Sequence, residues 1–238
     1  MNRSLRSLIR LALFVAAGYA LFKIVYPTIT YRIRLTLAVE QNGEVKTASS
    51  VIELETIQYP YFEGLDNLKG YETYVYGEAI CMNLGGNDRL VALLSGFPLE
   101  DDYIAKLPSH IFLDERDRTR PKSDQLAFFP EALDRVTNNP TPLTYMQMPR
   151  LVRFSNAADP QSIEVVDPNN LAARFGPGVA LRNATMEITH DPMISSIRDC
   201  LPWLKSEAAK SFSVNLRFPN RLPAPFPYHI DVSNFVRR

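Results

Sequence analysis

The chain has 238 residues, 46% hydrophobic and 22% charged, which is the composition of an ordinary globular protein and not of a disordered or fibrous one. Its basic and acidic side chains balance, but the first 26 residues hold four positive and no negative charges, so the remainder has a net charge of about −4. That remainder lacks the basic surface that binds a phosphate backbone, so nucleic acid is excluded as an expected partner.

The first predicted element is an apolar helix. An uninterrupted apolar run covers residues 11–22, which is shorter than the roughly 20 residues that a membrane span needs. The helix reaches that length over 8–26 if Arg10 and Lys23 extend their charges to the two interfaces. Tyr26 then lies at an interface and the proline after it ends the helix.

These boundaries predict three parts: a basic flank (1–7), a transmembrane anchor in contact with the lipid bilayer (8–26), and one domain (27–238). A cleaved signal peptide is the alternative, because the basic start and the small residues Gly18 and Ala20 also fit that template. The apolar character resumes after Ala20, which favours the anchor.

Strands dominate the first half of the domain. Residues 31–39 alternate apolar and polar side chains, Asn42-Gly43 favours a tight turn, and residues 45–57 form the returning strand. A second hairpin is expected from a strand over 73–81, through a turn at 85–88, to a strand over 90–94.

The middle of the chain, residues 97–150, is rich in proline and predicts irregular structure with one helix opening at Pro130. Short strands are expected over 150–154 and 162–166, on either side of the turn-forming Asp159-Pro160.

Two short helices are predicted next. Asp167 and Pro168 begin the first, which Gly176 ends, and Asp191-Pro192 begin the second, which continues to Cys200. Between them, residues 179–189 predict a strand with Ala184, Met186 and Ile188 on its core face and a bulge near 182–183. A last strand is expected over 228–232, so the fold class is α+β, with a mainly antiparallel sheet and a few short helices.

Cys81 and Cys200 form no C-x-x-C pattern, which argues against zinc and against a thioredoxin-type motif. Two interpretations stay open: both are buried small hydrophobes, or they form the single intramolecular disulfide that two cysteines allow in a domain outside the cytoplasm.

The common catalytic motifs are absent, and no cofactor or metal site is predicted. His190 is the one histidine next to a carboxylate, Asp191, but a helix cap explains Asp191 as well. Trp203, the only tryptophan, is either a core anchor or an interaction residue. Glu100-Asp101-Asp102 is expected to be a solvated turn, and the aromatic stretch 59–76 either packs or faces a ligand.

Several stretches carry a resemblance to a known family, and they cover most of the domain. They are residues 47–53, 165–179, 191–192 and 201–204. The chain resembles an uncharacterised family of mostly proteobacterial proteins with one N-terminal membrane segment, and the resemblance implies no activity or catalytic residues. Ser196 departs from the family pattern, which tends to have a glycine before the isoleucine of the last helix.

The first hypothesis for function is a non-enzymatic protein of the bacterial cell envelope, anchored in the inner membrane with its domain in the periplasm. It would bind a protein partner, for example as an accessory subunit of a membrane complex. The second is an extracytoplasmic enzyme or a small-ligand-binding domain. Since Lys23, Arg32 and Arg34 follow the apolar segment much as other arginines precede it, a cytoplasmic domain on a reversed anchor also stays open.

Overall fold

The fold is α+β with antiparallel sheets and a few helices, as the sequence predicts. The computed structural model describes residues 3–26, 28–58, 71–96, 102–113, 138–217 and 228–237. Within these ranges every strand pair is antiparallel.

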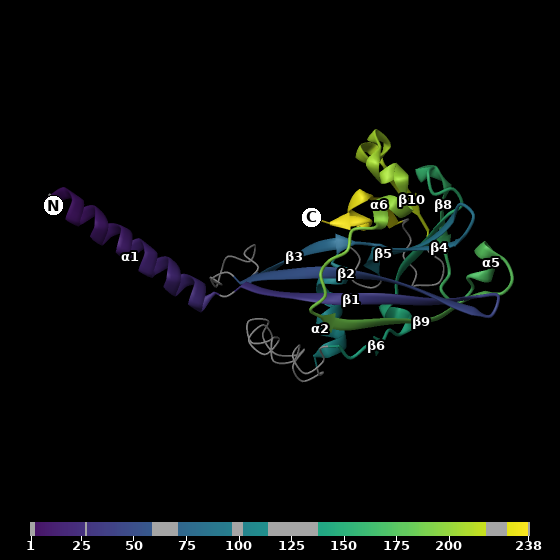
Figure 1. Cartoon of the computed structure of the whole chain (residues 1–238), viewed down its shortest axis with the longest axis horizontal. Helices are drawn as coiled ribbons and strands as arrows, with labels where there is room; N and C mark the ends of the chain where they lie inside the picture. The colour runs from purple at the N-terminus through teal and green to yellow at the C-terminus, as the bar shows by residue number, and fades with distance from the viewer. Residues whose placement is uncertain are drawn as a thin grey trace.

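Helix α1 (Arg3–Val25) projects away from the rest of the molecule (Figure 1). Residues 9–25 are all exposed to solvent. At its end, the rings of Phe22 and Tyr26 lie 5.1 Å apart, and Lys23 Nζ donates to Thr28 Oγ1 at 3.4 Å. A search of the described residues finds no helix whose length and hydropathy together suffice for crossing a membrane.

The larger sheet, called here the long sheet, has six strands in the order β12-β3-β2-β1-β9-β6. Its strands are β1 (Thr28–Gln41), β2 (Glu44–Gln58), β3 (Tyr71–Glu78), β6 (Thr141–Pro142), β9 (Val179–Thr189) and β12 (Val236–Arg237). The predicted first hairpin is confirmed: β1 and β2 pair along their whole length, and Asn42 and Gly43 turn with φ of 54° and 88°.

The predicted strand β9 is also confirmed, including its irregularity. Asn183 pairs with Ala38 but Leu181 pairs with Val39, so Arg182 is the extra residue of a β-bulge. Because of the bulge, Ala184 lies opposite Leu37 and Leu181 lies opposite Val39, so both apolar residues of β9 are on the core face although they are three residues apart.

A second sheet, of four strands and called here the short sheet, has the order β4-β5-β7-β8, and a third among the described residues consists of β10 (Ser213–Leu216) and β11 (Tyr228–Asp231) alone. The strands of the short sheet are β4 (Ile80–Gly85), β5 (Asp88–Gly96), β7 (Pro149–Phe154) and β8 (Ile163–Val166). The strands β7 and β8 match their predictions, and the η2 turn (Pro160–Ser162) joins them through Asp159, which accepts a hydrogen bond from the Gln161 backbone N–H at 2.9 Å.

The second predicted hairpin is confirmed in its turn at 85–88 and its returning strand, because β4 pairs with β5. The single strand predicted over 73–81 is wrong, because the chain changes sheets within it. β3 pairs with β2 in the long sheet, whereas β4 pairs with β5 in the short sheet. Gly77 permits the change: its φ is +153°, and a Cβ added to it would lie 3.0 Å from the Ile52 side chain.

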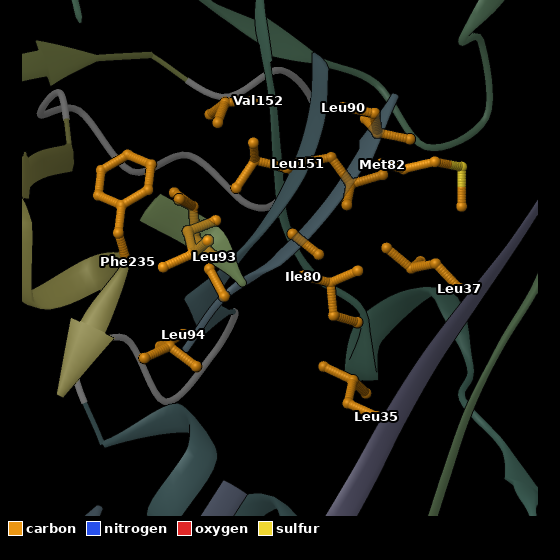
Figure 2. Packing of buried hydrophobic residues seen from close by; sticks show 14 of the residues in the cluster. Leu35, Leu37, Ile80, Met82, Leu90, Leu93, Leu94, Leu151, Val152 and Phe235 are labelled. Carbon is orange, nitrogen blue, oxygen red and sulfur yellow. The ribbon is translucent and has the colours of Figure 1, made fainter. Parts of the chain in front are cut away.

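The core lies on both faces of the short sheet. On one face, Leu35 and Leu37 of β1 lie opposite Ile80 and Met82 of β4 (Figure 2). On the other face packs the C-terminal part of the chain, called here the C-terminal layer. It consists of α6 (Ile197–Cys200), η3 (Pro202–Lys205), η4 (Glu207–Ser211), β10 (Ser213–Leu216), β11 (Tyr228–Asp231) and η5 (Val232–Asn234). Because it is covered on both faces, β5 is buried from Leu90 to Gly96.

Two helices differ from expectation. Helix α2 (Tyr103–Phe112) lies where irregular structure was predicted, and its buried residues Tyr103, Ile104 and Leu107 have helical spacing despite Pro108. Helix α5 (Ala172–Phe175) ends at Gly176 as predicted, but it starts late because Asp167 accepts from the Asn169 N–H in a preceding turn. A short η1 helix covers Tyr145–Gln147. The helix expected at Pro130 lies outside the described residues.

Candidate functional site

The predicted site residues lie in or next to one connecting segment. Residues 190–196, called here the strap, leave the end of β9 and cross the long sheet to reach α6 (Figure 1). The helix predicted to begin at Asp191 is therefore wrong, since only Ile197–Cys200 is helical. His190 and Asp191 open the strap, and Cys200 and Trp203 follow it.

The first end of the strap is fixed by two arginines of β1. Arg34 forms an ion pair with the Asp191 carboxylate and also binds Glu187 Oε1 at 2.5 Å. Arg32 donates to the Asp191 backbone carbonyl at 3.4 Å and to Glu53 Oε2 at 2.8 Å. Asp191 is not a helix cap because its carboxylate is engaged by Arg34.

The structure does not bring His190 and Asp191 into one site. His190 is exposed, and the neighbouring carboxylate is bound to Arg34. Adjacent residues at the end of an extended segment point in different directions, as the pleat requires. This geometry gives the pair no shared catalytic or metal-binding position.

The second end of the strap is fixed by Glu78, which the sequence analysis did not identify. The Glu78 carboxylate, whose residue is 8% exposed, accepts three hydrogen bonds: from Ser195 Oγ at 2.6 Å, the Ser196 N–H at 2.8 Å and the Ile197 N–H at 3.0 Å. The first N–H groups of a helix have no partner inside the helix. Glu78 therefore acts as the cap of α6 from a distant strand, and its negative charge suits that end of a helix.

The far end of α6 is fixed by a disulfide between Cys81 and Cys200, whose α-carbons are 6.3 Å apart. Of the two interpretations of the cysteines, the structure therefore supports the intramolecular disulfide and not two separate buried side chains. Glu78 and Cys81 are three residues apart at the junction of the two sheets, so one short segment holds both ends of α6. This arrangement of Glu78, Cys81 and α6 is called here the clamp.

Trp203 is a core residue. It is 3% exposed, and its ring centroid lies 4.6 Å from Phe212, 5.5 Å from Phe235 and 5.9 Å from Phe154. Within the part of the chain that the structure describes, its Nε1–H has no hydrogen-bond partner. These four rings join the C-terminal layer to the short sheet, so Trp203 serves packing and not recognition.

Three ionisable groups among the described residues have displaced pKa values. Burial raises the pKa of Tyr31 on β1. Desolvation and a hydrogen bond to Glu55 raise the pKa of Tyr76. The hydrogen bond from Lys205 and its charge lower the pKa of Asp199 on α6. Each of these three shifts has a structural cause.

The other two sequence candidates are placed only in part. Of the acidic cluster, Asp102 lies in the described residues, and Lys106 Nζ is 2.8 Å from its carboxylate. Of the aromatic stretch, Tyr74 and Tyr76 bond to Glu72 and Glu55 on the surface of the long sheet. Among the residues that the structure covers, no three His, Cys, Asp or Glu side chains form a metal-binding group.

The strap exposes two apolar side chains at its middle. Its middle residues Met193 and Ile194 are exposed, Ile194 by 66%, although both ends of the strap are fastened.

Comparison with models of protein families, with curated proteins and with solved structures gives no match to this chain.

Proposed function

We propose that this protein is a membrane-tethered module of the cell envelope, which α1 anchors in the bilayer and whose domain binds a partner protein outside the cytoplasm. The observation that carries the proposal is the surface of α1. Its exposed apolar side chains include Leu11, Leu13, Phe14 and Val15.

These side chains cover all sides of the helix. Successive residues of an α-helix are rotated by about 100°, so Leu13, Phe14 and Val15 point in three widely separated directions. A helix that is apolar all round belongs in an apolar environment and not in water. The domain does not cover it, since α1 extends away from the sheets (Figure 1). Lipid is the environment that fits, with Arg10 and Lys23 at the two ends of the apolar stretch.

The disulfide supports the location of the domain. Stable disulfides are rare in the reducing cytoplasm and common outside it. A Cys81–Cys200 bond therefore favours the extracytoplasmic side over a reversed anchor.

The strap supports binding to a protein. An exposed apolar side chain that is already held in place loses little conformational entropy when a partner covers it. Ile194 has this property, because Arg34 and Glu78 fasten the strap on either side of it.

The tether is tested by fractionation of cells that produce the full-length chain. We expect it in the membrane fraction after an alkaline carbonate wash. The variant Phe14→Lys with Val15→Lys should shift to the soluble fraction, because charges in the bilayer core are costly. Val45→Lys, which changes an exposed apolar residue of the domain, is the control. If the double variant stays with the membrane, α1 is not the anchor.

The partner is tested by purifying the chain from native membranes in a mild detergent. We expect a stoichiometric membrane protein to co-purify, and Ile194→Asp to reduce its yield severalfold while Val45→Asp does not. A chain that purifies alone argues against the module. Equal losses with both variants argue against the strap as the contact surface.

A further inference from the structure

The clamp holds helix α6, which is too short to be stable as an isolated helix. Helix α6 has four residues, about one turn, and isolated helices of that length are unstable in water. Its N-terminal N–H groups bond to Glu78, and its last residue, Cys200, bonds to Cys81. One non-covalent and one covalent support therefore hold the two ends of α6, in addition to the burial of Ile197 in the core.

The clamp segment is also where the layers of the domain meet. Ser50 Oγ of the long sheet donates to the Glu78 carbonyl at 2.6 Å. The N–H of the next residue, Ala79, donates to the Phe235 carbonyl of the C-terminal layer at 2.8 Å. The segment that holds both ends of α6 is therefore also bonded to the long sheet and to the C-terminal layer.

We propose that the Cys81–Cys200 disulfide is a reversible latch on the C-terminal layer, opened and closed by exchange with a dithiol partner, and that Glu78 is the positioning residue that keeps Cys200 beside Cys81 while the bond is open. The proposal does not depend on the membrane tether, because the latch lies wholly within the domain.

The exchange balances with a dithiol as the only co-reactant. A partner thiolate attacks one sulfur of the Cys81–Cys200 bond, and a mixed disulfide forms as the other cysteine leaves as a thiolate and takes up a proton. The second partner thiolate then displaces the remaining cysteine. The chain gains two electrons and two protons, and the partner becomes a disulfide. Closing reverses these steps.

The geometry favours reversibility. Both cysteines are half-buried, so an attacking thiolate can approach. After reduction, the three hydrogen bonds to Glu78 still hold the start of α6, three residues before Cys200. Such pre-positioning raises the effective concentration of one thiol at the other and so favours closing.

Trp203 reports the state of the latch, because it is the only tryptophan, lies three residues after Cys200 and is packed against Phe154 of the short sheet. Its fluorescence should shift to longer wavelength if the C-terminal layer loosens and water reaches the ring.

The experiment equilibrates the full-length chain, in mild detergent, with mixtures of reduced and oxidised glutathione. Open and closed chains are counted by a thiol-specific mass tag, and tryptophan emission and circular dichroism are recorded on the same samples. For the native sequence we expect a red shift on opening, retained strand signal, and full recovery on reoxidation. An unchanged emission on opening, or loss of the strand signal, overturns the latch.

The role of Glu78 is tested by Glu78→Gln, which should lower the equilibrium constant for closing about tenfold, since it removes the charged acceptor of three hydrogen bonds. Asp199→Asn is the matched control: it removes an exposed carboxylate of α6 that bonds to Lys205 and should change the constant less than twofold. If Glu78→Gln does not fold, Ser195→Ala, which removes one of the three hydrogen bonds, should shift the constant in the same direction by a smaller factor. Equal constants for Asp199→Asn and the Glu78 or Ser195 variant overturn the positioning role.

Discussion

The β1–β2 hairpin and helix α6 are both regular structure, but they are held in opposite ways. The hairpin pairs residues that are close in sequence, from Gln41 with Glu44 to Thr28 with Ile57. Helix α6 is held by Glu78 and Cys81, the latter 119 residues from its partner. The hairpin depends on contacts within one segment of the chain, so it can form early in folding. Helix α6 can dock only after the junction of the two sheets has brought Glu78 and Cys81 into position.

The largest effect should come from removing the covalent support. Replacing both cysteines by serine is expected to lower the free energy of unfolding by about 3–5 kcal/mol, because the bond closes a long loop in the unfolded chain. Urea unfolding with and without reductant measures this. The native chain should become reductant-sensitive and the double variant should not. A double variant as stable as the native chain would contradict the long-range dependence of α6.

The non-covalent support should matter less. Glu78→Gln is expected to cost about 2 kcal/mol, since charge-assisted hydrogen bonds to a buried carboxylate are lost. Glu72→Gln, on an exposed carboxylate of the same strand that bonds to Tyr74, should cost little in the same urea titration. Similar costs for the two variants would mean that Glu78 contributes no more than a surface group.

The hairpin should be most sensitive at its own turn. Gly43 has a φ of +88°, so Gly43→Ala is expected to cost about 1 kcal/mol. Gly43→Asn should cost less, because asparagine tolerates positive φ. Thermal unfolding of both variants checks the order. If alanine is tolerated as well as asparagine, the turn does not determine the stability of the hairpin.

The smallest effect is expected at alkaline pH. Burial raises the pKa of Tyr31 above its ordinary value near 10. Above about pH 10 the unfolded chain then binds fewer protons than the folded chain, so the free energy of unfolding falls as pH rises. Tyr31→Phe should flatten this decline in urea titrations at pH 8 to 11. An unchanged slope would assign the decline to other groups.

The same contrast explains what could be predicted from sequence. Alternation and the Asn42-Gly43 turn were enough for β1 and β2, and the apolar residues out of phase on β9 were enough for the bulge at Arg182. These signals are local, so they survive without knowledge of the fold. The general α+β class followed from them.

The predictions were wrong where residues distant in sequence determine the local structure. Alternation continues from β3 into β4, and no local signal says that the strands belong to different sheets. Asp191-Pro192 has the sequence of a helix start, but in the structure the Asp191 carboxylate forms an ion pair with Arg34 of a distant strand. The apolar spacing of α2 was present in the sequence, but Pro108 concealed it.

The candidate site was predictable only in pieces. The two cysteines allowed one bond, but a Cα separation of 6.3 Å is a property of the finished fold. Glu78 stands between a glycine and an apolar stretch, which is only a weak sign of a functional carboxylate. Its role as the cap of α6 is visible only in the folded structure. The sequence pointed to Trp203 and His190 as candidates, and the structure assigns the first to packing and the second to the surface.

The connection between α1 and β1 has a mechanical consequence. Only two residues separate Val25 from Thr28, and β1 lies inside the long sheet with β2 on one side and β9 on the other. A pull on α1 along the strand would load both ladders in shear, so that many hydrogen bonds share the force instead of breaking one after another. With so little slack, a displacement of the helix would move the whole domain with it.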